Sequence, residues 1–284
     1  MTTPHAPLVA FFDIDGTLID SDPEAYAAAQ APGASPEEQE RVFLPTRNVR
    51  DAVAEFVDAG NLAFLCSGRP PSGLALLMDS VPFSGYVALA GALGVMDGRE
   101  LFSHTVDRET MARAIGVFDE CSVAALLEGT RGSVVFMPAG EHPDIDLSVP
   151  VVTSVAEAVA AIDDLALVKA FWMAEEDGRL DPRREELAGL FRISDLGVGG
   201  FELTVPEISK ASGMADVLAA VGDHGTVYGF GDSENDTPML EAADVAVVME
   251  NGVPSVRPLA DVTAPPVSED GVATVLRAIL AGEL

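Results

Sequence analysis

Short runs of apolar residues alternate along this chain with segments in which apolar residues recur every three or four positions. The runs are typical of buried parallel strands, and they are residues 8–12, 62–66, 86–90, 227–231 and 245–249. The recurring pattern is typical of helices packed on a sheet, and its clearest examples are residues 49–57 and 214–221. Asn48 is the expected N-cap of the first helix, and Gly60 and Gly222 are expected to end the two helices. The alternation predicts an α/β fold with a parallel sheet.

The pattern changes in the middle of the chain. From about residue 86 a hairpin-like sequence surrounds Asp97-Gly98, and helix-like and strand-like segments follow in mixed order until residue 200. The earlier pattern returns at residue 201. A chain of 284 residues also favours two domains. We therefore expect one α/β domain formed by residues 1–85 and 201–284, with a second domain, residues 86–200, inserted between them.

Composition narrows the possible partners. The chain has 16 Lys and Arg against 46 Asp and Glu, a formal net charge of −30, so binding to nucleic acid or to an anionic membrane surface is not expected. No apolar run approaches the roughly 18 residues that a membrane helix needs. The apolar N-terminal run ends at Asp13, which does not fit a signal peptide. Two cysteines, Cys66 and Cys121, cannot build a disulfide framework, so we expect a cytoplasmic protein, either a monomer or a homodimer.

The sequence FFDIDGTLID places two carboxylates directly after the first strand-like run. Asp13 and Asp15 stand at positions i and i+2, so both side chains are expected on the same side, and Gly16 permits a sharp turn. Two such charges at ~4 Å repel by roughly 4 kcal/mol at an effective dielectric near 20. A divalent cation or a bound proton would relieve this repulsion, and both suit phosphoryl transfer. Taken alone, the pair also fits an ordinary turn with capping Asp residues.

The sequence FGDSENDTPML follows another apolar run and is rich in oxygen ligands. Its four side chains of this kind are Asp232, Glu234, Asn235 and Asp236. Such a group suits a hard cation, although an acidic loop that caps the next helix has the same composition. Parallel sheets bind ligands beyond the carboxyl ends of their strands, where both acidic groups are expected.

Two further segments contain groups that suit a phosphate. In CSGRP, the Ser67 hydroxyl and the backbone at Gly68 can receive a phosphate oxygen, whereas a surface salt bridge is expected for Arg69. Lys210 opens a predicted helix in a chain with only one other lysine, Lys169, which indicates that a compact ammonium is needed there.

Together these segments resemble the haloacid dehalogenase-like (HAD) superfamily of phosphohydrolases. DIDGTL is similar to its first motif, SGR to the second, Lys210 to the third and GDSEND to the fourth. The C-terminal run VAVVMENGVPSVRPLADVTAPPVSEDGVATVL resembles the Cof-type branch, whose cap domain lies between the second and third motifs. The resemblance implies a Rossmann-like parallel-sheet core with an inserted α/β cap domain.

The resemblance also implies roles for the candidate residues. Asp13 corresponds to the nucleophile that forms an aspartyl-phosphate, and Asp15 to the general acid and base. The implied Mg²⁺ ligands are Asp13, the backbone carbonyl of Asp15, Asp232 and Asp236. The implied phosphate-binding residues are Ser67, Gly68, Lys210 and Asn235. Two positions depart from the family pattern, because Ala90 and Glu250 stand where the family commonly has Asn and Gly.

These observations predict a Mg²⁺-dependent phosphatase acting on a small phosphorylated metabolite, with a sugar phosphate as the expected substrate. A phosphotransferase or phosphomutase would keep every motif and remains an alternative. A phospho-receiver signalling protein uses similar residues, but it is a single compact domain and lacks an inserted one. A binding protein without catalysis is disfavoured because every motif residue is present.

Overall fold

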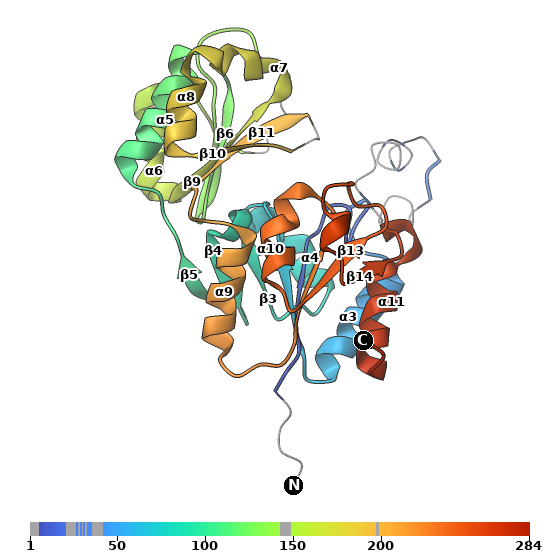
Figure 1. The fold of residues 1–284 in the computed structure, drawn as a ribbon. Coiled ribbons are helices and arrows are strands. Elements are labelled where there is room, and N and C mark those ends of the chain that lie inside the picture. Colours follow the sequence, from blue (N-terminus) through green and yellow to red (C-terminus); the bar gives the residue numbers. More distant parts are fainter. Residues whose placement is uncertain are drawn as a thin grey trace.

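The computed structural model describes residues 6–20, 42–142, 149–196 and 199–284, together with residues 27, 29, 31 and 33–35. The described residues form two units, each with its own sheet and its own apolar core (Figure 1). We call them the large unit and the small unit. In Figure 1 the small unit, green to yellow, lies above the large unit. No helix among these residues is long and apolar enough to cross a membrane.

The large unit is built on an eight-stranded sheet with the order β14-β13-β12-β1-β2-β3-β4-β5. Its strands are β1 (Val9–Phe12), β2 (Leu62–Cys66), β3 (Gly85–Ala88), β4 (Leu93–Met96), β5 (Arg99–Ser103), β12 (Val227–Gly231), β13 (Val245–Met249) and β14 (Val262–Ala264). Pairing is parallel from β14 to β3, whereas β4 and β5 add an antiparallel edge. The predicted α/β fold with a parallel sheet is confirmed.

Helices cover both faces of this sheet. They are α3 (Arg47–Asp58), α4 (Ala75–Ser80), α9 (Lys210–Val221), α10 (Thr237–Ala242) and α11 (Gly271–Ala281). Along β1, Ala10 and Phe12 pack with α3 and α11, whereas Val9 and Phe11 pack with α9 and α10. Burial on both faces explains why β1 is a continuous apolar run rather than an alternating one. Because β1 lies in the middle of the sheet, the residue that follows it, Asp13, lies in the interior of the large unit.

The start of α3 differs from the prediction by two residues. Thr46, not Asn48, is the N-cap, because its hydroxyl accepts a hydrogen bond from the Val49 amide at 3.3 Å. Asn48 lies inside the helix and donates to the Asp270 carboxylate at 2.9 Å. Both residue types cap helices well, and the contact with a residue near the C-terminus could not be anticipated from local sequence.

The small unit contains a six-stranded sheet with the order β10-β11-β9-β6-β7-β8. Its strands are β6 (Ala125–Gly129), β7 (Gly132–Phe136), β8 (Val151–Val152), β9 (Leu167–Met173), β10 (Arg192–Asp195) and β11 (Gly200–Thr204). Its helices are α5 (Arg108–Glu120), α6 (Val155–Leu165), α7 (Ala174–Asp177) and α8 (Arg184–Leu190). Leu127 of β6, Ala170 of β9 and Leu203 of β11 point toward the core formed with α5, α6 and α8. Successive side chains of a strand point to opposite faces of its sheet. The residues next to them therefore point to the opposite face.

The expected bounds of the inserted domain, residues 86–200, need correction at both ends. The hairpin at Asp97-Gly98 does form, with positive φ at both positions, but its strands β4 and β5 pair with β3 in the large sheet. At the other end, β11 pairs with β9 and β10 in the small sheet. Alternating antiparallel strands show the same pattern in either unit, so the sequence could not assign them. We propose that the inserted unit comprises about residues 104–205.

Candidate active site

The two aspartates after β1 differ in burial and in hydrogen-bond partners. The Asp13 amide donates to the Phe230 carbonyl of β12 at 2.9 Å, and Asp13 is only 4% exposed. The side chain of Asp15 is 47% exposed. Gly16 has φ +86°, and a Cβ there would lie 2.3 Å from Asp232 Oδ2, so the turn requires glycine. Asp13 and Asp15 therefore have different partners.

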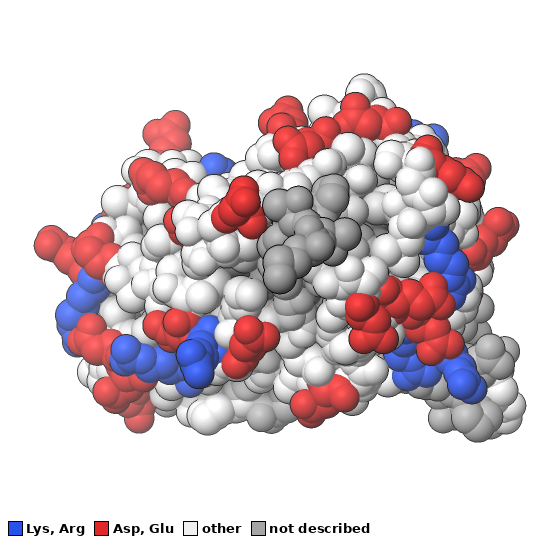
Figure 2. Space-filling model, turned by 90° about the horizontal axis from the view of Figure 1, so that it is seen from below, with Lys and Arg blue, Asp and Glu red and all other residues white. Residues whose placement is uncertain are grey.

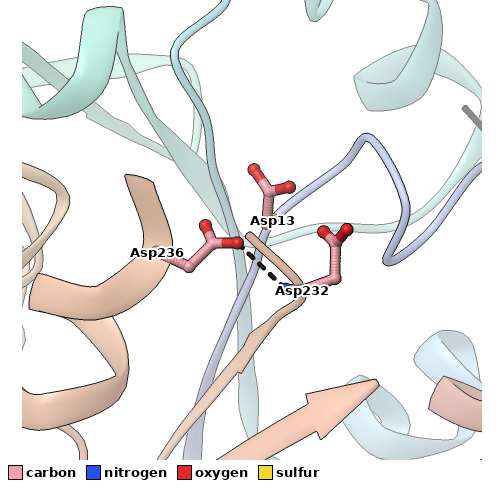
Figure 3. A group of neighbouring side chains, drawn as sticks. All are labelled: Asp13, Asp232 and Asp236. Atoms are coloured by element: carbon pink, nitrogen blue, oxygen red, sulfur yellow. Dashed lines mark hydrogen bonds between the residues drawn. The ribbon is translucent and has the colours of Figure 1, made fainter. Parts of the chain in front are cut away.

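Asp13 joins an acidic cluster formed with the loop after β12. One carboxylate oxygen from each of Asp13, Asp232 and Asp236 lies within 4.8 Å of the others (Figure 3). The backbone amides of Asp232 and Ser233 each donate to Asp236 Oδ2 at 3.0 Å, and Thr17 donates to Asp232 Oδ1 at 3.2 Å. The three carboxylates meet because β1 and β12 are neighbouring parallel strands whose carboxyl ends share one edge.

Lys210 enters this cluster from the first turn of α9. Its ammonium donates to Asp13 Oδ1 at 2.5 Å and also to Asp236 Oδ1, and its side chain is 1% exposed. The helix begins there because Ser209 caps it and accepts a hydrogen bond from the Ser212 amide at 3.2 Å. The third motif is thus brought to the first and fourth motifs.

The cluster has more negative charge than one ammonium can balance. Burial raises the pKa of Asp13 to about 8, and repulsion by Asp236 and Asp232 adds to this, whereas Lys210 opposes it. Burial also raises the pKa of Asp232 to about 7, again with repulsion from Asp236. Burial disfavours the charged form of Lys210, but Asp13 and Asp236 outweigh it and raise its pKa. Two buried carboxylates and one half-buried carboxylate at this spacing are a donor set that fits a hard divalent cation.

The loop after β2 contains the second motif. Ser67 is buried, its amide donates to the Val87 carbonyl at 2.9 Å, and its Oγ accepts from the Arg69 amide at 3.2 Å. Arg69 forms a bidentate salt bridge with Asp15: its Nε donates to Oδ2 at 3.0 Å and its Nη2 donates to Oδ1 at 2.6 Å. A salt bridge was predicted for Arg69, but its partner, the candidate general acid, was missed. The only available signal was the position of Arg69 two residues after Ser67.

Three polar residues near the fourth motif have other partners. Asn235 is exposed and accepts a hydrogen bond from Ser233 Oγ at 2.8 Å. Glu234 does not join the acidic cluster and instead accepts from Ser255 Oγ at 2.9 Å. Asn251 was not anticipated: its amide donates to the Gly16 carbonyl at 2.8 Å and so links the first-motif turn to the C-terminal run.

Two other buried residues belong to the apolar cores rather than to the acidic cluster. Trp172 is buried and stacks on Phe201 in the core of the small unit. Cys66 is buried next to the cluster, and burial raises the pKa of its thiol to about 12, so it is not a nucleophile near neutral pH.

Comparisons with known proteins agree with this arrangement. The sequence pattern of the haloacid dehalogenase-like hydrolases matches residues 10–276. YkrA of Bacillus subtilis, named as a candidate phosphatase, is 26% identical over 94% of this chain and 95% of its own.

Two solved structures show the same fold. BT1666 of Bacteroides thetaiotaomicron, from a study of HAD phosphatases, has a TM-score of 0.74 and 22% identity, covering 98% of this chain and 96% of its own. The HAD subclass IIB sugar phosphatase BT4131 has a TM-score of 0.73 and 20% identity, covering 95% of this chain and 98% of its own. Because the family pattern spans nearly the whole chain and the fold agrees, this protein belongs to the haloacid dehalogenase-like hydrolases, in their Cof-type branch.

Proposed function

We propose that this protein is a Mg²⁺-dependent phosphatase that hydrolyses a small phosphorylated metabolite, a sugar phosphate by class, through a phosphoryl group transferred to Asp13. The observation that supports this most is the meeting of Asp13, Asp232, Asp236 and Lys210 at the carboxyl edge of the large sheet. A buried carboxylate beside an ammonium and two further carboxylates suits in-line attack on phosphorus. The family assignment gives independent support.

The acidic cluster is the proposed Mg²⁺ site. Asp13, Asp232 and Asp236 would hold the ion, and the backbone carbonyl of Asp15 is the further ligand implied by the family. When bound, Mg²⁺ supplies positive charge that neutralises the phosphoryl oxygens and lets Asp13 approach them. Lys210 would share this task, since its ammonium already contacts Asp13 and Asp236.

The proposed reaction has two steps. In the first, an Asp13 oxygen forms a bond to phosphorus while the bond to the leaving oxygen breaks, and Asp15 donates a proton to that oxygen. In the second, Asp15 accepts a proton from water, whose oxygen bonds to phosphorus and releases Asp13 and phosphate. In the structure both Asp15 oxygens accept from Arg69, which is the arrangement of a carboxylate able to take a proton from water in the second step; one of the two contacts would open when Asp15 carries the proton of the first step. Ser67 would donate to a phosphoryl oxygen.

A sugar phosphate, whose leaving group is an uncharged sugar, is the proposed substrate class for two reasons. The surface is strongly acidic: Asp and Glu are scattered over the face in Figure 2, with the few Lys and Arg groups beside them. A field of this sign disfavours leaving groups that are themselves anionic. In addition, the solved sugar phosphatase BT4131 shares the fold over most of both chains.

A substrate panel tests the proposal. Phosphate release is measured with several sugar phosphates, with phosphoglycolate and with p-nitrophenyl phosphate, each in Mg²⁺ and in chelator. We expect release that depends on Mg²⁺, that favours sugar phosphates over phosphoglycolate, and that Asp13→Asn abolishes. Full activity in chelator, or an isomerised phosphate ester in place of free phosphate, would contradict it, the latter in favour of a phosphomutase.

A further inference from the structure

The small unit contains a buried ion-pair cluster that the proposed reaction does not use. Lys169 of β9 lies between Glu128 of β6 and Glu202 of β11, with its Nζ 3.3 Å from Glu128 Oε2 and 2.8 Å from Glu202 Oε2. None of the three side chains is more than 7% exposed. Each is the sequence neighbour of a core residue, namely Leu127, Ala170 or Leu203. Because neighbours in a strand point to opposite faces, the three charged side chains lie on the sheet face opposite α5, α6 and α8. Removing three charged groups from water costs free energy, so we expect this cluster to have a role beyond the stability of the small unit.

The cluster lies against the second-motif loop of the large unit. Lys169 Nζ donates to the Gly68 carbonyl at 3.0 Å. A Cβ added to Gly68 would have this same Nζ as its nearest neighbour, at 3.5 Å. A charged group of the inserted unit therefore contacts the backbone between Ser67 and Arg69.

The other two carbonyls of this loop are held from within the large unit. The Ser67 carbonyl accepts from the Ala90 amide, and the Arg69 carbonyl accepts from the Leu89 amide, each at 3.0 Å. Leu89 and Ala90 both have positive φ, +52° and +55°, a conformation that is unfavourable for residues other than glycine. The large unit thus fixes two of three successive carbonyls, and Lys169 fixes the one between them.

The geometry of one peptide group connects Lys169 to Ser67. The Gly68 carbonyl and the Arg69 amide belong to the same planar peptide unit, so holding one orients the other. The Arg69 amide donates to Ser67 Oγ at 3.2 Å. With that lone pair occupied, the Ser67 hydroxyl proton is free to point toward a phosphoryl oxygen. Lys169 therefore fixes the plane that orients the Ser67 hydroxyl.

Lys169 has no donor left for a substrate. An ammonium has three N–H bonds, and Lys169 has three acceptors within 3.3 Å: Glu128, Glu202 and the Gly68 carbonyl. Burial disfavours its charged form, but the two glutamates outweigh this and raise its pKa, so it stays cationic.

We propose that Lys169 is a positioning residue for the phosphate-binding loop, supplied by the inserted unit and acting through the Gly68 carbonyl rather than by touching substrate. This inference rests on the proposed phosphatase function. Its consequence is that the small unit sets the rate of phosphoryl transfer itself, in addition to any contact with the leaving group.

The test compares two variants that differ only at Lys169. Lys169→Met alone would leave Glu128 and Glu202 facing each other without a cation, so the reference is the Glu128→Gln/Glu202→Gln double variant, and the triple variant adds Lys169→Met. Trp172, the only tryptophan in the chain, lies on the same strand and reports by fluorescence whether the small unit is folded. For both variants, kcat and KM are measured on p-nitrophenyl phosphate and on a sugar phosphate, and the Kd of inorganic phosphate in Mg²⁺ is measured by calorimetry.

We expect the triple variant to have an about tenfold lower kcat than the double variant, by the same factor on both substrates, and an about tenfold weaker affinity for phosphate. Equal kcat and Kd in two folded variants would overturn the proposal. A loss confined to KM for the sugar phosphate would also overturn it, because Lys169 would then contact the leaving group. If the wild-type protein hydrolyses neither substrate, the proposed function fails, and the phosphate Kd alone decides whether Lys169 positions the loop.

Discussion

Replacing Asp13 by Asn is predicted to stabilise the metal-free protein while it abolishes turnover. Asn has the same shape, can accept from Lys210 and can donate to a neighbouring carboxylate, so the change removes one charge from the cluster with little repacking. The opposite result would be expected if Asp13 were an ordinary structural residue, because breaking a buried ion pair destabilises a protein. The sign of the effect therefore tests the electrostatic description of the site.

The magnitude follows from the distances. The Lys210 contact at 2.5 Å favours the Asp13 charge by roughly 7 kcal/mol at an effective dielectric of about 20. Each of the two other carboxylates, within 4.8 Å, opposes it by roughly 3.5 kcal/mol at the same dielectric. These terms nearly cancel, which leaves the cost of burying the Asp13 charge to decide the sign, in line with its raised pKa. We expect a gain of about 1–3 kcal/mol in the free energy of unfolding for Asp13→Asn.

Urea unfolding at pH 7 measures this gain, with and without Mg²⁺. In chelator, Asp13→Asn should be more stable than wild type, whereas Mg²⁺ should stabilise the wild type more and reduce or reverse the difference. The exposed Asp58→Asn is the control, with an expected change within about 0.5 kcal/mol in either condition. A less stable Asp13→Asn protein in chelator would refute the reasoning.

Three further predictions concern the same site. In chelator, the free energy of unfolding should fall as pH rises from about 4 to about 8, because the raised pKa values of Asp13 and Asp232 let the folded state keep protons that the unfolded state has released. Urea unfolding at a series of pH values measures this, and a flat profile would contradict it. Bound Mg²⁺ should reduce the slope. Asp15→Asn should slow the release of the leaving group in a single turnover at least tenfold more for sugar phosphates than for p-nitrophenyl phosphate, whose leaving group needs no proton; equal losses in this first-step rate would exclude the general acid role. Gly16→Ala should weaken Mg²⁺ binding measured by calorimetry, since its Cβ would meet Asp232, whereas Gly98→Ala, which also has positive φ but no close neighbour, should leave Mg²⁺ binding unchanged.

The meeting of the motifs could be predicted from sequence because it follows from the large sheet. Apolar runs that are buried on both faces identify parallel strands, and parallel strands place their carboxyl ends at one edge. Asp13 and Asp232 each follow such a run, and the structure places them in one cluster. Lys210 was singled out because it begins a predicted helix in a chain with only two lysines, and its role was implied by the family resemblance.

Contacts between the units could not be predicted in this way. Lys169 stands in an apolar strand, which signals a buried charge, but nothing local names Glu128, Glu202 or Gly68 as its partners. The contact of Arg69 with Asp15 is also between distant segments and depends on the exact turn after β1. The same limitation applies to β4 and β5, whose alternating pattern fits the edge of either sheet.

The most direct test of the account is the identification of the phosphorylated residue. The Asp15→Asn variant should accumulate the intermediate, because it lacks the base that activates water for the second step. Rapid acid quenching after mixing with p-nitrophenyl phosphate and Mg²⁺, followed by peptide mass spectrometry, should show one phosphoryl group on Asp13, lost on treatment with hydroxylamine and absent from Asp13→Asn. A phosphoryl group on another residue, or none during rapid single-turnover hydrolysis, would contradict the central claim that Asp13 is the nucleophile.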